Sequence, residues 1–241
     1  MISGKGFADR CDWVYDPRYP DRRRFSYTEA PDGAWVFVNG DYINSFLETF
    51  PFLTMKRFYL IVHNSDRSFT EETLQRLRKH VHHIFAINTA IRHPRVTTIP
   101  LGFADNQLEF LSTFRPETVE RTIEVYLNIK PHHNWEKRGQ CIEAVKGDPR
   151  VVNRERVSVP EYYADLCRSQ FVLCPEGTGM DTHRVYEAIL CGATPVVLRN
   201  ALSHLYEGLP VCLVNSWTDP YVHPPKRAVS FTVQTFLVRN A

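Results

Sequence analysis

The sequence predicts an α/β protein built on two mainly parallel β-sheets, and three observations carry this prediction. Short runs of β-branched and aromatic residues alternate with helix-like segments along most of the 241 residues, which is the pattern of βαβ units. The rhythm pauses over residues 105–121, a polar connection with a short helix, and then restarts. The composition, 43% hydrophobic and 23% charged, is that of an ordinary globular chain. We therefore expect two domains, residues 1–118 and 119–241.

The first half of the chain alternates strands and helices in a regular way. Its apolar runs predict strands, and its amphipathic runs predict helices. In the clearest helix, Ser68 or Thr70 is the expected cap, and acidic residues come early and basic residues late. The predicted strands are 34–39, 57–66, 83–88 and 96–102, and the predicted helices are 41–50 and 68–81.

The second half repeats this alternation up to about residue 216, where prolines and charges break the pattern. Because strands that alternate with helices form parallel sheets, ligands are expected at the carboxyl ends of the strands. The predicted strands are 122–129, 156–160, 170–175, 193–198 and 210–215, and the predicted helices are 135–145, 161–169, 182–191 and 201–208.

Charge and residue usage exclude several classes of function. The net charge of +2 gives no basic field for nucleic acid. No run of 18 apolar residues predicts a membrane span, and the first residues lack the apolar core of a signal peptide. The six cysteines form no C-x-x-C pair and are expected to be buried, reduced thiols. The histidine clusters at 80–83 and 132–133 lack partners at metal-ligand spacing. We expect no metal, no cofactor and a cytoplasmic protein.

Residues 171–200 carry the strongest functional signal. An apolar strand ends at Pro175, and the loop Gly177-Thr178-Gly179 follows it. Glycines let backbone N–H groups approach a ligand closely. Asp181 or Thr182 is the expected N-cap of the next helix, and the free N–H groups of a helix start favour a phosphate.

The first turns of this helix carry His183, Arg184 and Glu187 on one side. A guanidinium pairs with phosphate oxygens in a fork, and a carboxylate one turn further along can accept hydrogen bonds from two ribose hydroxyls. A plain ion pair between Arg184 and Glu187, with the glycines making only a tight turn, is the alternative. The loop is neither G-x-G-x-x-G nor a Walker loop.

The same stretch resembles the donor-binding half of exostosin-like glycosyltransferases. The matching motifs are Pro175-Glu176-Gly177-Thr178-Gly179, Asp181-Thr182-His183-Arg184, Glu187-Ala188, Gly192 and Pro195-Val196-Val197. The resemblance implies a GT-B architecture, in which two Rossmann-like domains face a cleft and the C-terminal domain holds a nucleotide-sugar. It also implies an inverting transfer, usually from a UDP-sugar.

By this resemblance, Arg184 holds the diphosphate and Glu187 the ribose. The loop from Asn128 to Arg138 borders the same pocket, with Arg138 as a second phosphate contact. Glu176 stands where a basic or polar residue is expected, which leaves the role of this position open. No Asp-x-Asp motif occurs, so we expect the charge on the leaving UDP to be neutralised without metal, by Arg184, a helix N-terminus and Arg138 or Lys130.

An inverting transfer also needs a general base for the acceptor hydroxyl, and we expect it at a strand end of the N-terminal sheet. Asp66 ends the sequence Leu-Ile-Val-His-Asn-Ser-Asp and is the favoured candidate. His63 and Asp41 are the next candidates. The alternative for Asp66 is a turn residue or cap before the helix that begins near Ser68.

The resulting hypothesis is a metal-independent inverting glycosyltransferase with a nucleotide-sugar and a glycan or glycoprotein acceptor as partners. A nucleotide-sugar epimerase or phosphorylase and a non-catalytic nucleotide- or glycan-binding module remain open, and a nicotinamide oxidoreductase is a weaker fourth reading. The compact form is similar to enzymes of this class in large algal viruses, for which the compartment is the host cytoplasm. UDP-xylose, UDP-galactose, UDP-glucose and GDP-sugars remain open as donors.

Overall fold

A computed structural model describes residues 1–18, 31–49, 57–225, 229 and 231–233. The chain forms two compact units, of which the first contains residues 1–105 and 231–233 and the second residues 106–229. This division falls earlier in the chain than the expected boundary between 118 and 119. Within the described residues, no helix is long and apolar enough to cross a membrane.

The first unit holds a five-stranded parallel sheet whose strands follow one another in chain order. Its strands are β1 (Trp13–Tyr15), β2 (Trp35–Asn39), β3 (Phe58–His63), β4 (Val81–Ala86) and β5 (Val96–Thr98). Its helices are α1 (Gly4–Ala8), α2 (Ile43–Thr49) and α3 (Glu71–Leu77), with a 3₁₀ turn at Gly40–Tyr42.

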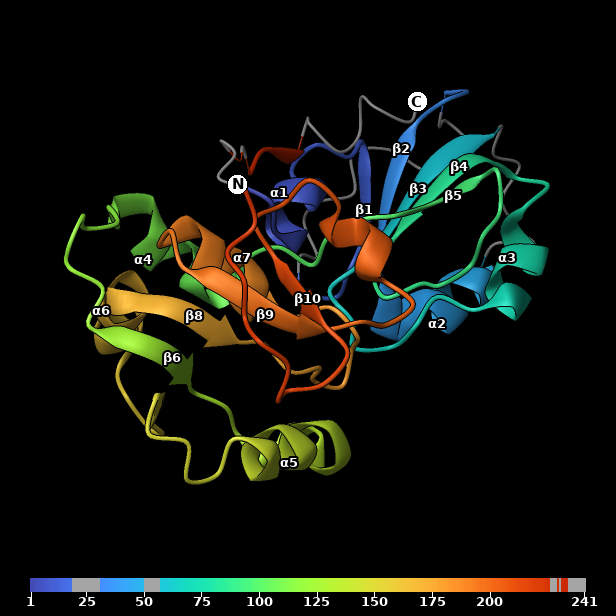
Figure 1. Cartoon of the computed structure of the whole chain (residues 1–241). Coiled ribbons are helices and arrows are strands. Elements are labelled where there is room, and N and C mark those ends of the chain that lie inside the picture. The colour runs from blue at the N-terminus through green and yellow to red at the C-terminus, as the bar shows by residue number, and fades with distance from the viewer. Residues whose placement is uncertain (19–30, 50–56, 226–228, 230, 234–241) are drawn as a thin grey trace. The chain divides into compact units, whose positions relative to one another are not determined.

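Both faces of this sheet are covered, which explains why its strands read as continuous apolar runs. Leu60 and Val62 face a core shared with α2 and α3, whereas Ile61 faces a core shared with α1. Figure 1 shows α1 on one side of this sheet and α2 and α3 on the other. Val233 is fully buried in the second of these cores. The backbone N–H of Ile2 donates to the carbonyl of Phe231 at 3.2 Å. The described C-terminal residues therefore belong to the first unit.

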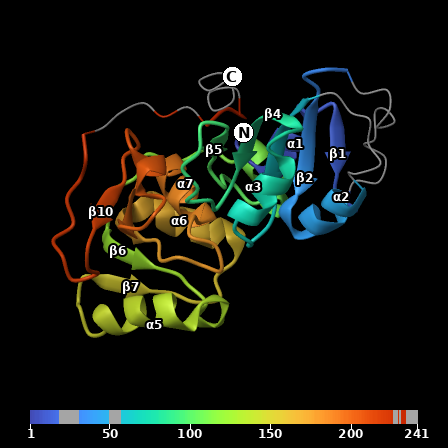
Figure 2. The same ribbon diagram turned by 90° about the vertical axis from the view of Figure 1, so that its right-hand side faces the viewer.

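The second unit holds another five-stranded parallel sheet, with the order β10-β9-β8-β6-β7. Its strands are β6 (Ile123–Leu127), β7 (Val151–Asn153), β8 (Ser169–Leu173), β9 (Thr194–Leu198) and β10 (Cys212–Val214). Its helices are α4 (Leu108–Thr113), α5 (Trp135–Ala144), α6 (Val159–Arg168) and α7 (His183–Leu190), with 3₁₀ turns at Asp105–Gln107, Pro131–His133 and Ser203–Tyr206. Helix α5 covers one face of the sheet, and α6 and α7 cover the other (Figure 2).

The strand order of the second unit reverses between β6 and β8, because the chain moves outward to β7 from one side and to β9 from the other. Such a reversal is a topological switch point, where open parallel sheets bind their ligands. The prediction of an α/β fold with two mainly parallel, Rossmann-like sheets is confirmed. The cleft between two domains stays a prediction.

One predicted strand is wrong. Residues 156–160 form no strand, and the strand of this region is β7, a few residues earlier. Arg156 adopts a left-handed backbone conformation with φ of 57°. Ser158 then caps α6 in a capping box, in which its side chain accepts from the backbone of Glu161 and the Glu161 side chain accepts from the backbone of Ser158.

Smaller differences concern the ends of the chain and the last predicted helix. Residues 201–208 contain only the 3₁₀ turn Ser203–Tyr206, and α1 and β1 were not predicted. Thr70, rather than Ser68, is the N-cap of α3, and its side chain accepts from the backbone N–H of Thr73.

Candidate functional site

The loops that follow β6 and β8 flank the switch point of the second unit and lie against each other. The side-chain amide of Asn134, after β6, donates to the carbonyl of Gly177, after β8, at 2.7 Å. The Nε of Arg138 donates to the carbonyl of Glu176 at 3.3 Å. These two contacts join the glycine loop to the start of α5 at the carboxyl edge of the sheet.

Arg138 is held in place by the N-terminus of α5. Asn134 is the N-cap of this helix, and its side-chain oxygen accepts from the backbone N–H of Lys137 at 3.1 Å. This cap fixes the first turn, from which the buried Arg138 side chain donates through Nη1 to the carbonyl of Lys130 at 2.9 Å. The guanidinium thus binds a carbonyl from each of the two loops, which places its positive charge between them.

Gly177 is required by close packing rather than by an unusual backbone angle. A Cβ atom at this position would lie 3.0 Å from Nη2 of Arg138, which is tighter than ordinary van der Waals contact. Gly177 is therefore in close contact with an arginine of the neighbouring loop, and the close approach of the loop to a ligand stays a prediction.

Helix α7 begins at the switch point with its N-cap at Thr182, whose side chain makes no capping hydrogen bond. Asp181 is buried, and its carboxylate accepts hydrogen bonds from at least three groups of the protein. They include the backbone N–H of Thr182 at 2.8 Å, the hydroxyl of Tyr186 at 2.6 Å and the hydroxyl of Tyr206 at 2.9 Å. The pKa of Tyr186 is raised well above its usual value by burial and by this carboxylate. Asp181 therefore braces the end of the loop.

Among the side chains that the structure describes, Arg184 and Glu187 form no direct ion pair, which was the alternative reading of the sequence. Glu187 is only 4% exposed and accepts from the hydroxyl of Tyr162, on α6, at 2.7 Å. The Nε of Arg184 is buried with no hydrogen-bond partner in the described part of the chain. A buried donor without a partner is uncommon in folded proteins, so this guanidinium has hydrogen-bonding capacity left for a ligand.

The charge of Arg184 reaches groups from three elements around the switch point. Burial raises the pKa of the Cys141 thiol, on α5, to about 12, and the charge of Arg184 opposes this rise. Burial also raises the pKa values of Cys174, directly after β8, and of Tyr162, on α6. The positive charge of Arg184 opposes these two rises as well. For Arg184 itself, burial lowers the pKa, but Tyr162, Cys174 and Glu187 raise it and the net shift is upward. The guanidinium stays charged.

The other predicted donor-site residues divide between the loop and its surroundings. Thr178 is exposed, Gly179 is buried and His183 is half-buried. Asn128 turns toward the end of β7, where its amide donates to the carbonyl of Arg154 at 2.6 Å. Glu176, whose role was open, accepts from the side chain of Asn200 at 2.8 Å, and this contact ties the glycine loop to the segment after β9.

The three predicted base candidates lie at the carboxyl edge of the sheet in the first unit, in different environments. His63 ends β3 and is buried. Its Nδ1 accepts from the backbone N–H of Asn64 at 2.7 Å, and its Nε2 lies 3.3 Å from the carbonyl of Pro100. Asp41 is exposed and accepts from the hydroxyl of Ser65 at 2.7 Å. Asp66 is exposed. The loops after β2 and β3 are thus brought together, and the two carboxylates are the accessible groups.

Asp16 is a carboxylate at this edge that sequence reasoning missed. It follows β1 and is buried, with Arg18 bound to both of its oxygens and the amide of Asn39 at 3.1 Å. Burial alone would raise its pKa, but the hydrogen bonds from Arg18 lower it and the net shift is downward. An Asp directly after the apolar run Trp-Val-Tyr was the available signal, but that run is short for a strand.

The second unit is thus a parallel α/β unit whose switch point carries a glycine loop and two arginines, which is an arrangement suited to an anionic ligand. Residues 106–220 match the family model described as the RXYLT1 C-terminal domain, a xylosyltransferase-related family of the exostosin-like type. The match contains every predicted donor-site residue. It relates this part of the chain to glycosyltransferases and confirms the predicted relationship at that level. No curated protein matches the chain.

Proposed function

We propose that the protein is an inverting, metal-independent glycosyltransferase that moves a sugar, with UDP-xylose as our first choice of donor, to a hydroxyl of a glycan or glycoprotein. The observation that carries the proposal is the pair of arginines, Arg138 and Arg184, at the switch point of the unit that matches a glycosyltransferase-related family. Residues 106–229 are then the nucleotide-sugar-binding side, and the first unit is the acceptor side.

In this proposal the diphosphate lies at the glycine loop, between the two guanidiniums. Arg184 has a buried Nε without a partner, and Arg138 is already oriented by the carbonyls of Glu176 and Lys130. Oriented donors stabilise developing charge without having to rearrange during the reaction. The leaving UDP would therefore be stabilised by two cations and by the start of α7, where the Thr182 side chain makes no capping hydrogen bond.

Glu187 is the proposed ribose contact. The Tyr162 hydroxyl holds one of its oxygens, Oε2, at 2.7 Å, so the carboxylate has a fixed orientation. A fixed carboxylate can accept hydrogen bonds from two neighbouring hydroxyls, which is how it would select a ribose nucleotide.

Inverting transfer balances as a single displacement. The acceptor oxygen attacks the anomeric carbon and loses its proton to a carboxylate, while the bond from that carbon to UDP breaks and UDP leaves with the electron pair. Asp66 remains our proposed base, because it is exposed while both ring nitrogens of His63 are already engaged by the backbone. Asp41 is the next candidate.

The test begins with the affinity for UDP measured by isothermal titration calorimetry. Arg184→Ala should weaken UDP binding by at least tenfold, because a hydrogen bond to a charged group contributes about 1.5–3 kcal/mol. Arg115→Ala, which removes an exposed arginine of the same unit, is the matched control and should bind UDP normally. Equal affinity for UDP in wild type and Arg184→Ala would overturn the assignment of the phosphate site.

The second measurement is the release of UDP from UDP-xylose with and without a panel of glycans. Release that depends on an added glycan is expected of a transferase. Release without a glycan would instead indicate hydrolysis, and interconversion of the sugar would indicate an epimerase. Binding of UDP without either reaction would indicate a binding module.

A further inference from the structure

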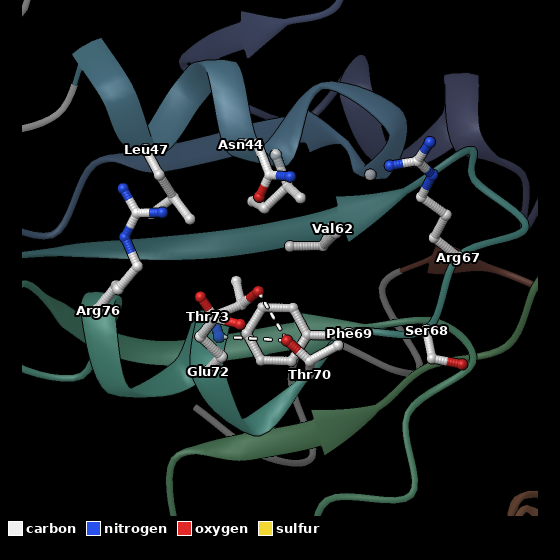
Figure 3. A pocket seen from close by; sticks show the side chains of 12 residues that line it. Asn44, Leu47, Val62, Arg67, Ser68, Phe69, Thr70, Glu72, Thr73 and Arg76 are labelled. Atoms are coloured by element: carbon white, nitrogen blue, oxygen red, sulfur yellow. Dashed lines mark hydrogen bonds between the residues drawn. The ribbon is translucent and has the colours of Figure 1, made fainter.

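A cavity of about 310 Å³ opens in the first unit between α2, the end of β3 and the start of α3. Figure 3 shows Asn44 and Leu47 along one side of it, Phe69, Thr70 and Thr73 along the other, and Val62 between them. This volume is at the lower end of the range for ligand pockets in proteins, about 300–1,000 Å³. The cavity can therefore hold a ligand about as large as a monosaccharide.

The cavity has an apolar floor and a polar rim. Leu47, Val62 and Phe69 are buried, with exposed fractions of 3%, 5% and 6%. Asn44 and Ser68 are exposed at its edge and form no side-chain hydrogen bond with another described residue. A sugar or polyol presents C–H groups on one side and hydroxyls on its edges, so this division suits such a ligand.

Two arginines stand at opposite ends of the cavity (Figure 3). Arg67 and Arg76 are both exposed, and neither guanidinium forms an ion pair with any residue that the structure describes. The backbone N–H of Arg67 donates to the hydroxyl of Ser65 at 2.9 Å, which fixes the loop that carries this side chain. Glu72 is the one carboxylate among the described lining residues. These residues therefore give the cavity a net positive charge.

Thr70 contributes to the shape of the cavity more than to its hydrogen-bonding capacity. Its hydroxyl accepts from the backbone N–H of Thr73 at 3.2 Å and lies 3.0 Å from the Thr73 hydroxyl. Because this cap is satisfied within α3, the groups left for a ligand are Asn44, Ser68 and Glu72 for hydroxyls and the two arginines for an anionic group.

We propose that this cavity is a binding site for a small polyhydroxylated anion, meaning a sugar or polyol that carries a phosphate or a carboxylate. The anionic group binds a guanidinium, and the hydroxyls bind Asn44, Ser68 and Glu72. The proposal goes beyond the transferase assignment, because it concerns a ligand site of the first unit and does not depend on UDP binding in the second.

The experiment is a calorimetric titration of the full chain with four probes: glucose 6-phosphate, glucuronate, glucose and inorganic phosphate. Glucose 6-phosphate or glucuronate should bind, and glucose and inorganic phosphate should each bind at least tenfold more weakly. Arg67→Gln or Arg76→Gln, whichever removes the guanidinium that binds the anionic group, should weaken the binding of the charged sugar by about tenfold, and unchanged affinity in both variants would overturn the proposal. Arg92→Gln, which changes an exposed arginine of the same unit outside the cavity, should leave it unchanged.

The probes separate the sources of the anionic group. Binding of glucose 6-phosphate alone supports a phosphate ligand, and binding of glucuronate alone supports a carboxylate ligand. The proposal is overturned if neither charged sugar binds, if inorganic phosphate binds as tightly as glucose 6-phosphate, or if the Arg92 variant loses as much affinity as the other two. Repeating the titration with UDP present should not change the result, and competition by UDP would also reject the site.

Discussion

Replacing Tyr162 with Phe should both destabilise the second unit and weaken its affinity for UDP. The change removes one hydroxyl and leaves the aromatic ring, so the packing of α6 is preserved. The lost contact is the 2.7 Å hydrogen bond to Glu187, a carboxylate that is only 4% exposed. Hydrogen bonds to charged groups contribute about 1.5–3 kcal/mol to stability. Because the carboxylate stays buried without this donor, we expect a loss of about 2–3 kcal/mol.

The assay is urea unfolding and thermal unfolding, both followed by circular dichroism, together with UDP titration calorimetry. For a chain of this length, the expected loss corresponds to a fall in Tm of about 4–12 °C. Tyr221→Phe is the matched control, because its hydroxyl donates to a neutral backbone carbonyl, that of Trp217, and should cost about 0.5–1.5 kcal/mol. If Tyr162→Phe changes neither the free energy of unfolding nor the UDP affinity, the assigned role of the Tyr162–Glu187 pair is refuted.

Three further predictions address the glycine loop, the base and the buried tyrosines. Gly177→Ala should displace Arg138, since the new Cβ would lie 3.0 Å from Nη2 of that arginine. Calorimetry should show about tenfold weaker UDP binding, and urea unfolding should show a loss of less than about 1 kcal/mol in the free energy of unfolding. An unchanged UDP affinity would contradict the role of Arg138. Asp66→Asn should bind UDP normally but transfer no sugar, and near-normal turnover would remove Asp66 from the mechanism. The pKa values of Tyr162 and Tyr186 are raised well above 10 by burial and by nearby carboxylates, so both hydroxyls keep their protons in the folded state after an unfolded chain has lost them. The free energy of unfolding should therefore be insensitive to these two tyrosines below about pH 10 and fall as the pH rises further. A spectrophotometric titration in which both tyrosines ionise at their usual pH in the folded protein would contradict this prediction.

The predictable part of the fold is the alternation of strands and helices, because a parallel strand covered on both faces must be apolar throughout. Val62 and its neighbours on β3 show this clearly, with both core faces drawn from one continuous run. The wrong strand at 156–160 has a local cause. Its valines suit a strand, but Ser158 and Glu161 form a capping box, and this local hydrogen-bond pattern starts a helix instead.

The candidate site was predictable in its residue types but not in its contacts. Arg184 and Glu187 share a helix, and their spacing suggested an ion pair or a ligand site. Glu187 instead accepts a hydrogen bond from Tyr162, which lies on α6. A local sequence pattern cannot predict this contact, because it depends on the tertiary packing of two helices. The same holds for Gly177, whose close neighbour is Arg138 of another loop.

The strand order explains why two arginines distant in sequence both lie in helix starts at the switch point. From the switch point, the chain leaves β6 through α5 toward β7 and leaves β8 through α7 toward β9, in opposite directions across the sheet. Because such crossovers are right-handed, the two helices cover opposite faces, as Figure 2 shows. Their first turns therefore approach the carboxyl edge from both sides, with Arg138 in one and Arg184 in the other. A diphosphate at this edge would receive a guanidinium from each side, whereas two arginines on one helix would contact it from one side only.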